Sequence, residues 1–279
     1  MPKARASEPA PDQDRWVKVS GSRVRVRVTG QGPDLLLLNG IGAHAGMWEP
    51  LVARLSATRR LIMVDMPGTG ASPALWVPRR MPSLARFVIG VLNALKLDRL
   101  DVLGYSWGGT LAQQIALDHP RRVARLCLVS TLPGVGGSPP SLRVASAMLD
   151  PTRFSTRERA REAAALLYGG EYRKNGRVAA GSALVRWSDR PPSRTGYAHQ
   201  LYAIAGWSSL YKLHRVRART LIICGDDDPL VPVKNAHLMA HQLRDATVYI
   251  APGGGHLWLL DHAEESAGVI ERFLAAGRD

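Results

Sequence analysis

The stretch Leu100-Asp-Val-Leu-Gly-Tyr-Ser-Trp-Gly-Gly-Thr110 leads from an apolar run, through Gly104-Tyr-Ser-Trp-Gly108, into a segment of helical character that ends near Asp118. A Gly-x-Ser-x-Gly pattern in this setting is typical of a strained strand-to-helix turn that holds the serine hydroxyl clear of the sheet. The glycines let strand and helix approach closely. By itself the pentapeptide is equally consistent with a turn that needs glycine for its backbone alone. Its position between a strand and a helix makes Ser106 a candidate nucleophile.

Short apolar runs of the same kind recur along the chain, at residues 35–38, 61–64, 100–103, 126–129, 221–224 and 248–250. Such nearly continuous runs are typical of strands buried on both faces of a parallel sheet. Helical segments separate most of them, at residues 47–55, 83–95, 110–118, 234–242 and 263–275. The alternation predicts an α/β fold with a mostly parallel sheet and helices on both faces. Ahead of these runs, residues 16–28 alternate apolar and polar around Ser20-Gly-Ser22, which predicts an antiparallel hairpin.

The alternation stops between residues 133 and 217, where a Gly- and Pro-rich stretch opens a region without strand patterning. Amphipathic helical segments are expected there at residues 145–149, 156–167, 178–187 and 196–205. We therefore expect a disordered tail (1–15), a first core part (16–132), an inserted helical cap (133–217) and a second core part (218–279).

Composition narrows the class of protein. A chain of 279 residues with 46% hydrophobic content can bury one large core with an insertion. Its formal charge of +14 attracts polyanions, but the arginines are scattered and no zinc-finger or RNA-binding signature accompanies them, which disfavours specific nucleic-acid binding. No run approaches the roughly 20 apolar residues of a membrane span, and residues 1–15 lack a secretory signal, so we expect a cytoplasmic protein. Cys127 and Cys224 lie in apolar runs and are expected to be core residues.

A base and an acid follow Ser106 at later strand ends, where active groups of a parallel sheet gather. His256 comes after the run 248–250, and Asp226-Asp-Asp228-Pro comes after the run 221–224. A serine hydroxyl needs a base to take its proton, and the imidazolium then needs an acid beside it. We favour Asp228 as that acid because Pro229 biases it toward an extended backbone; Asp226 and Asp227 remain alternatives. The order Ser, Asp, His is that of α/β-hydrolases.

An oxyanion hole needs two backbone donors, one from the residue after the nucleophile and one from the loop after an earlier strand. These are predicted to be the N–H groups of Trp107 and of Ile41, in the loop Asn39-Gly-Ile-Gly42. The same loop supports a rival class. Gly40-x-Gly-x-x-Ala45, followed by Asp65, mimics the fingerprint of a nicotinamide-dependent oxidoreductase. That class leaves the Ser–Asp–His order unexplained, and the mimic follows a hairpin rather than the first strand, so no cofactor is expected.

Histidines outside the predicted triad have ordinary explanations. His237 and His241 are spaced i, i+4, but without a His-Glu-x-x-His motif or a third ligand they indicate a solvated helix face and no metal site. His44 could touch substrate or brace its loop.

Aromatic side chains of the expected cap could line an acyl pocket, although most such residues pack a cap onto its sheet. They are Trp187, Tyr197, Tyr202 and Trp207. Only Trp207 is taken as a candidate substrate-binding residue.

Several motifs together resemble those of intracellular medium-chain-length polyhydroxyalkanoate depolymerases, from about Arg23 to Leu274. They are Asn39-Gly-Ile-Gly-Ala, Val64-Asp-Met-Pro-Gly-Thr-Gly-Ala-Ser, Ser106-Trp-Gly-Gly-Thr-Leu-Ala-Gln-Gln, Tyr168-Gly-Gly, Gly206-Trp-Ser-Ser, Gly225-Asp-Asp-Asp-Pro-Leu-Val-Pro and Gly255-His-Leu-Trp-Leu-Leu. Most relatives have histidine at the position of Asn39. The N-terminal tail and the arginine-rich cap also depart from the family.

The resemblance implies an α/β-hydrolase that cleaves polyesters of (R)-3-hydroxy fatty acids or their oligomers, with Ser106, Asp228 and His256 as its triad. It implies an ester substrate and makes a polyester granule surface a candidate partner. The related polymer synthases use cysteine in the elbow, so Ser106 favours hydrolysis over chain growth. Alternatives are a carboxylesterase or lipase for small esters, a carbon–carbon bond hydrolase, and a non-catalytic granule- or ligand-binding protein.

Overall fold

A single eight-stranded sheet organises the computed structural model, which describes residues 13–150, 157–175 and 193–276. The strand order is β1-β2-β4-β3-β5-β6-β7-β8, antiparallel at β1/β2 and β2/β4 and parallel elsewhere. The strands are β1 (Gln13–Val19), β2 (Ser22–Thr29), β3 (Asp34–Leu38), β4 (Arg60–Val64), β5 (Leu100–Tyr105), β6 (Val123–Val129), β7 (Arg219–Gly225) and β8 (Ala246–Ala251). The predicted mostly parallel sheet is confirmed.

Both ends of the sheet depart from the sequence expectation. β1 begins at Gln13, inside the stretch expected to be a disordered tail, because it pairs along its whole length with β2. Residues 1–12 of that expected tail lie outside the described residues. At the other end, Val248–Ile250 is only half-buried, so the prediction of a strand buried on both faces is wrong for β8. β8 is an edge strand with β7 as its one neighbour in the sheet.

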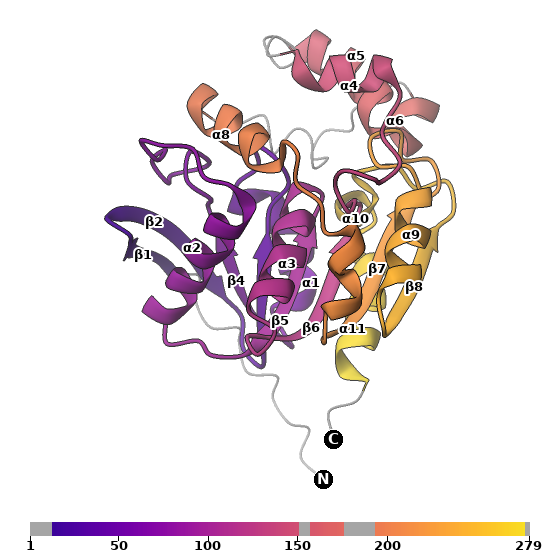
Figure 1. Cartoon of the computed structure of the whole chain (residues 1–279). Coiled ribbons are helices and arrows are strands. Elements are labelled where there is room, and N and C mark those ends of the chain that lie inside the picture. Colours follow the sequence, from indigo (N-terminus) through magenta and orange to yellow (C-terminus); the bar gives the residue numbers. More distant parts are fainter. Residues whose placement is uncertain (1–12, 151–156, 176–192, 277–279) are drawn as a thin grey trace.

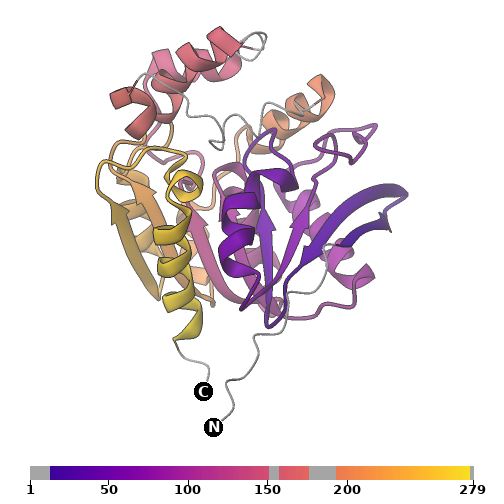
Figure 2. The same cartoon turned by 180° about the vertical axis from the view of Figure 1, so that it is seen from behind.

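Helices cover both faces of the sheet, as Figures 1 and 2 show from opposite sides. One face carries α2 (Met81–Ala94), α3 (Trp107–Asp118) and α9 (Lys234–Gln242); the other carries α1 (Glu49–Leu55) and α11 (Ala263–Ala275). All five were predicted from their apolar spacing. Four short helices within the described residues were not, because four to six residues are too few to display a helical period: η1 (Ala45–Trp48), α6 (Gly170–Asn175), η2 (Leu210–Arg215) and α10 (Trp258–Asp261).

The segment between β6 and β7 contains α4 (Leu142–Leu149), α5 (Arg157–Tyr168), α6 (Gly170–Asn175) and α8 (Arg194–Ile204). These helices lie at the end of the molecule opposite the chain termini (Figure 1). Ser141 and Ser193 begin α4 and α8 by accepting hydrogen bonds from Val144 N and Gly196 N. The helix expected at residues 178–187, with Trp187, lies outside the described residues.

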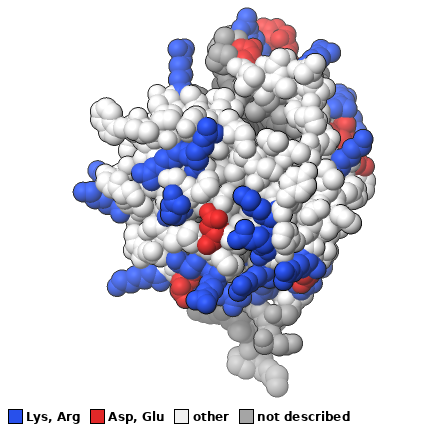
Figure 3. All heavy atoms as spheres, in the orientation of Figure 1, with Lys and Arg blue, Asp and Glu red and all other residues white. Residues whose placement is uncertain are grey.

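The surface is basic. Lys and Arg side chains are spread over much of the face seen in Figure 1, with few Asp and Glu among them (Figure 3). The scatter fits a net charge of +14 that comes from many separate positions.

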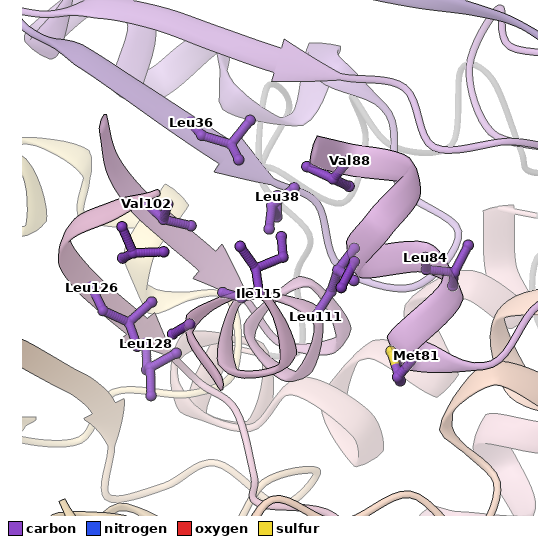
Figure 4. Close-up of a cluster of buried hydrophobic side chains, with 14 of the residues drawn as sticks. Leu36, Leu38, Met81, Leu84, Val88, Val102, Leu111, Ile115, Leu126 and Leu128 are labelled. Carbon is purple, nitrogen blue, oxygen red and sulfur yellow. The ribbon is translucent and has the colours of Figure 1, made fainter. Parts of the chain in front are cut away.

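The layers between helices and sheet are apolar. On one face, Leu84 and Val88 of α2 and Leu111 of α3 pack with Leu38 and Val102 of the sheet (Figure 4). A second cluster fills the opposite layer, beneath α1 and α11. Burying each such side chain contributes about 1.5–3 kcal/mol to folding. The two layers hold the strands rigidly, and with them the loops at the strand ends.

Candidate active site

Ser106 stands at the end of β5, in a backbone conformation rare for a residue with a side chain, with φ 52° and ψ −118°. The turn is held from β6, where Val129 O accepts from Ser106 N at 2.8 Å and Thr131 Oγ1 donates to Ser106 O at 2.7 Å. Only glycine fits at position 108, since a Cβ atom there would lie 2.1 Å from Leu38 O. The elbow predicted from the sequence is thus a strained turn wedged between β3 and β6.

Two loops bring a histidine and a carboxylate to this serine. His256 Nε2 lies 3.0 Å from Ser106 Oγ, and His256 Nδ1 lies 2.7 Å from Asp228 Oδ2. Ser106 is 8% exposed, His256 2% and Asp228 5%, so little water competes for these hydrogen bonds. The arrangement can pass the serine proton to the imidazole while the carboxylate stabilises the resulting positive charge.

The structure separates the three neighbouring aspartates. Asp228 Oδ1 accepts from Leu230 N and Val231 N, both at 2.9 Å, which leaves Oδ2 directed at His256. Asp226 instead accepts from Gly253 N, and Asp227 accepts from Gly170 N and pairs with Arg173. Only Asp228 of the three reaches the histidine.

Two tyrosines hold the His256 loop. Tyr168 O accepts from His256 N at 2.7 Å, and Tyr105 Oη donates to His256 O at 2.9 Å. Burial raises the pKa of Tyr105 well above its usual value, with a further contribution from the Asp228 charge. The phenol therefore stays a neutral donor across the ordinary pH range.

A pocket partly open to solvent, here called the Ser106 cavity, lies beside the serine hydroxyl and spans about 280 Å³ with its solvent-filled mouth included. Its lining is mostly apolar apart from Ser106 and His256 themselves. The lining residues are Gly40, Ile41, Tyr105, Ser106, Met148, Tyr168, Leu230 and His256. Met148 and Tyr168 come from α4 and α5, far from the triad in sequence, so neither was identified as a site residue from its local pattern.

Ile41 and Trp107, the predicted oxyanion donors, flank Ser106. Ile41 lines the Ser106 cavity, and Trp107 is the first residue of α3. The first N–H groups of a helix have no acceptor within that helix, so Trp107 N–H is available to a ligand. The oxyanion-hole role of these two N–H groups stays a prediction.

Asn39 holds the loop that contains Ile41, residues 39–45, here called the Asn39 loop. Its Nδ2 donates to Val64 O at 3.0 Å, and its Oδ1 accepts from Trp48 Nε1 at 2.6 Å. Asp65 Oδ1 accepts from Ala45 N at 2.7 Å. Asp65 is fully buried and also pairs with Arg25, so it serves this loop and not the ribose of a dinucleotide.

Gln200 of α8 joins the Asn39 loop to the start of α3. Its Oε1 accepts from Gly42 N at 2.7 Å, and its backbone O accepts from Trp107 Nε1 at 3.0 Å. A single residue of the inserted segment thus contacts the chain next to both predicted oxyanion donors. No motif in the sequence pointed to it.

Trp207 lies elsewhere. Its indole donates to Gln114 Oε1 at 2.6 Å and packs in the apolar layer beside α3, and it is not among the residues that line the Ser106 cavity. The expectation of a substrate-binding role is therefore unsupported, and the packing alternative fits its position. His44 Nδ1 accepts from Gly46 N at the start of η1. This bond fits the expectation that His44 braces its loop, which was the alternative to substrate contact.

Tyr197 and Tyr202, two other aromatics of the inserted segment, each contact a protein group. Tyr197 Oη donates to Met148 O at 3.2 Å, and Tyr202 lies under the guanidinium of Arg80, 4.0 Å from its ring centre. Of the aromatics considered in the cap, Tyr197 acts on the Ser106 cavity indirectly, through Met148.

The structure also places the candidate metal-binding and thiol side chains. Among residues 13–150, 157–175 and 193–276, no three His, Cys, Asp or Glu side chains are grouped so as to hold a metal ion. Both cysteines are buried and unbridged. Burial raises the pKa of the Cys224 thiol to about 12, so it is not a reactive thiolate near neutral pH.

Known proteins are similar to this chain in fold and in sequence. A family model described as the alpha/beta hydrolase fold matches residues 33–263. The chain belongs to the α/β-hydrolase family. It is a hydrolase by this membership, and within the described residues no helix is long and apolar enough to cross a membrane.

Individual α/β-hydrolases can be compared over nearly the whole chain. The chain is 35% identical to a poly(3-hydroxyalkanoate) depolymerase of Ectopseudomonas oleovorans over 97% of its own length and 95% of that protein. It is 30% identical to a 2-hydroxymuconate semialdehyde hydrolase of Pseudomonas putida, with 97% of each chain covered. The solved meta-cleavage product hydrolase of Pseudomonas fluorescens superposes with a TM-score of 0.80 at 20% identity, over 94% of this chain and 97% of that one, which shows the shared fold.

Within this α/β-hydrolase, two motifs of the resemblance anchor the inserted segment beside the triad. At Tyr168-Gly-Gly170, a Cβ atom on Gly169 would lie 2.0 Å from Asp227 O, so only glycine allows this approach. At Gly206-Trp-Ser-Ser209, Trp207 and Ser209 bond to the glutamines of α3. These motifs thus fix the inserted segment against the loop of Asp227 and against α3.

Proposed function

We propose that this α/β-hydrolase is a serine esterase that cleaves poly(3-hydroxyalkanoate) chains, or oligomers of 3-hydroxy fatty acids, through an acyl-enzyme. The observation that carries the ester chemistry is the continuous set of hydrogen bonds from Ser106 Oγ through His256 to Asp228. Ser106 is the nucleophile, His256 the general base and then acid, and Asp228 the group that orients the imidazole. The N–H groups of Ile41 and Trp107 form the oxyanion hole.

In the first half-reaction, Ser106 Oγ attacks the ester carbonyl carbon and its proton passes to His256 Nε2. The carbonyl oxygen becomes an oxyanion between the two backbone donors, where preorganised N–H groups stabilise it. When the tetrahedral intermediate collapses, the ester C–O bond breaks and His256 gives its proton to the departing alkoxide. The products of this step are an alcohol and the acyl-enzyme.

In the second half-reaction, a water molecule gives a proton to His256 as its oxygen attacks the acyl carbon. Collapse of the second intermediate breaks the bond to Ser106 Oγ, and His256 returns the proton to that oxygen. The acid is released and the enzyme is restored. No cofactor or metal takes part in this scheme.

The proposed substrate class rests on the 35% identity to the depolymerase and on the walls of the Ser106 cavity. Ile41, Met148 and Leu230 present alkyl groups next to the nucleophile. Such walls suit the hydrocarbon side chain of a medium-chain 3-hydroxyacyl unit, since burying it removes apolar surface from water.

We also assign residues 133–217 the role of a cap over the active site. Met148 and Tyr168 line the Ser106 cavity from this region, which supports the assignment. On the same region, Leu142 and Leu149 of α4 are 90% and 64% exposed. Exposed leucines beside an active site suit contact with an apolar solid, and a polyester granule surface is the proposed partner.

The deciding experiment measures release of soluble 3-hydroxyoctanoate from a suspension of amorphous medium-chain polyester, with p-nitrophenyl octanoate assayed in parallel. Release from the polyester together with ester hydrolysis supports the proposal. Hydrolysis of the soluble ester alone points to a carboxylesterase or lipase. Retention of the protein on the polyester without any turnover identifies a binding protein.

A carbon–carbon bond hydrolase is the second candidate, favoured by the 30% identity to the 2-hydroxymuconate semialdehyde hydrolase. The same assay distinguishes it when 2-hydroxymuconate semialdehyde is added as a third substrate. Turnover of that compound, with both esters left intact, replaces the proposed function.

A further inference from the structure

A second cavity lies on the other side of the nucleophile elbow from α4, between α8 and the chain that leads from β4 into α2. It is partly open to solvent, spans about 290 Å³ with its solvent-filled mouth included, and is here called the Arg79 cavity. Its lining residues are Met66, Pro67, Leu75, Arg79, Leu84, Trp107, His199 and Gln200. The described linings of this cavity and the Ser106 cavity have no residue in common, but Trp107 directly follows Ser106 in the chain.

Most of the wall is apolar. Met66, Leu75, Leu84 and Trp107 are all less than a tenth exposed and form a surface on which an alkyl chain can be buried. Leu84 belongs to the packed layer beneath α2, which fixes this wall in place (Figure 4). A hydrocarbon group seated here would be stabilised by the removal of its methylenes from water.

Three hydrogen-bond donors line the same cavity. The Arg79 guanidinium lies over the ring of Phe87, 5.3 Å from its centre, a stacking that leaves the edge N–H groups free to donate. Within the described parts of the chain, no ion pair joins Arg79 to a carboxylate. The positive charge of the Arg79 guanidinium therefore lacks an acidic partner of its own.

Gln200 supplies the third donor. It is 3% exposed, and its Nε2 has no hydrogen-bond partner, although its Oε1 and backbone O are both occupied. Leaving a buried amide N–H unsatisfied costs free energy, because the group has lost its hydrogen bonds to water. An acceptor atom from a ligand in the Arg79 cavity would remove that cost.

We propose that the Arg79 cavity binds the free carboxylate end of a 3-hydroxyacyl chain, with the carboxylate on the Arg79 and Gln200 donors and the alkyl side chain against the apolar wall. This inference rests on the proposed function for the identity of the chain. A guanidinium favours a carboxylate because its planar N–H groups match the two oxygens. The enzyme would then prefer oligomers that end in a free acid over the same oligomers with that end blocked.

Carboxylate binding also bears on the oxyanion hole. A ligand held by Gln200 Nε2 fixes the amide whose Oε1 holds Gly42 N in the Asn39 loop. Gln200 is thus a positioning residue, which couples occupancy of the Arg79 cavity to the loop that carries Ile41.

The test compares the ester-linked dimer of 3-hydroxyoctanoate, in which the leaving alcohol carries the free carboxylate, with its methyl ester. For the wild type, kcat/KM for the free acid should exceed that for the methyl ester by about tenfold, the effect of one charge-assisted hydrogen bond. Arg79→Met should bring this ratio close to one. Because the ratio compares two substrates on one protein, general damage to catalysis cancels.

Arg86→Met is the matched control, because Arg86 is an exposed arginine of α2 that does not line the Arg79 cavity. This variant should keep the wild-type ratio. A ratio near one in the wild type, or an unchanged ratio in Arg79→Met, overturns the inference. If the wild type hydrolyses neither dimer, the proposed function fails, and calorimetric titration of 3-hydroxyoctanoate into Ser106→Ala protein decides the cavity alone. Binding that Arg79→Met abolishes supports the carboxylate site; no binding, or equal binding by both proteins, refutes it.

Discussion

At the scale of single residues, Ser106 is where strain and chemistry meet, since its φ of 52° aims the hydroxyl at His256. Ser106→Ala removes the attacking oxygen that we propose and should lower kcat for p-nitrophenyl octanoate by about 10⁶-fold. The melting temperature should change little, because alanine is smaller and the backbone bonds of the turn remain. Ser83→Ala, on the outer part of α2, is the control and should retain full activity. Turnover by Ser106→Ala at the wild-type rate would falsify the nucleophile assignment.

The aspartates give a second prediction at this scale. Asp228→Asn preserves shape but removes the charge that stabilises the imidazolium and favours the wrong His256 tautomer, so kcat should fall by about 10⁴-fold. Asp226→Asn, two residues away, affects only a turn bond to Gly253 N and should leave kcat close to that of the wild type. Paired kinetics of the two variants on the soluble ester make the comparison. A larger loss in Asp226→Asn would transfer the role to that residue.

Sequence reasoning finds a residue when local chain geometry determines its place. Ser106 and His256 each follow a strand of a parallel sheet, so their meeting at one edge could be predicted from order alone. Gln200 and Tyr168 reach the same site from an inserted segment whose docking is set by contacts such as His256 N with Tyr168 O. Their positions depend on tertiary packing, so neither periodicity nor chain order assigned them to the site, although Tyr168-Gly-Gly is one of the motifs of the resemblance.

At the scale of elements, the buried strands and long helices were predictable because each displays its period over several turns or a whole run. β8 was predicted as a strand, but its place at the edge of the sheet was not, since an apolar run in the sequence does not reveal whether a neighbour covers its second side. α10 escaped prediction for a different reason: Trp258–Asp261 is one turn, set by the packing of its apolar residues between α1 and α11. A helix must extend over several turns before its period shows in the sequence, and the burial of a strand depends on which elements pack beside it.

Helix α4 has exposed leucines that we expect to contact the polyester. Its Val144 is buried, whereas Leu142 and Leu149 are largely exposed, so the helix presents apolar side chains outward as well as inward. The double variant Leu142→Ser/Leu149→Ser should reduce release of 3-hydroxyoctanoate from the polyester suspension several-fold, because each serine removes apolar contact area. Hydrolysis of dissolved p-nitrophenyl octanoate should continue at nearly the wild-type rate.

Leu238→Ser is the control for this experiment, since Leu238 is an exposed leucine on α9, away from the inserted helices (Figure 1). It should leave both activities unchanged. If the α4 variant lost both activities in parallel, the leucines would act on the cavity and not on the polymer surface. Equal release by the α4 variant and the wild type would remove α4 from the docking surface.

At the scale of the whole molecule, the sheet is tied to the C-terminal helix by a buried cluster of charges. Arg59, 1% exposed, pairs with Asp101 of β5 and with Glu271 of α11, each at 3.2 Å. Arg125 of β6 adds a second cation to Asp101 at 3.4 Å. The cluster joins residues far apart in the chain, and the sequence alone gave no reason to single out Arg59 among so many arginines. It lies next to the start of β4, the end of a parallel strand opposite to the one where active groups gather.

Arg59→Met should therefore lower stability without touching catalysis. The variant leaves Asp101 and Glu271 with part of their countercharge removed, and breaking a buried pair typically costs about 3–5 kcal/mol. Arg60→Met is the matched control, because the adjacent Arg60 is 45% exposed where it pairs with Asp34, and such surface pairs contribute at most about 1 kcal/mol. Urea unfolding at neutral pH measures both variants, and kcat per folded molecule should equal that of the wild type in each. Equal losses of unfolding free energy in the two variants would mean that the cluster adds nothing beyond a surface pair, and the C-terminal helix would then be held by its apolar face alone.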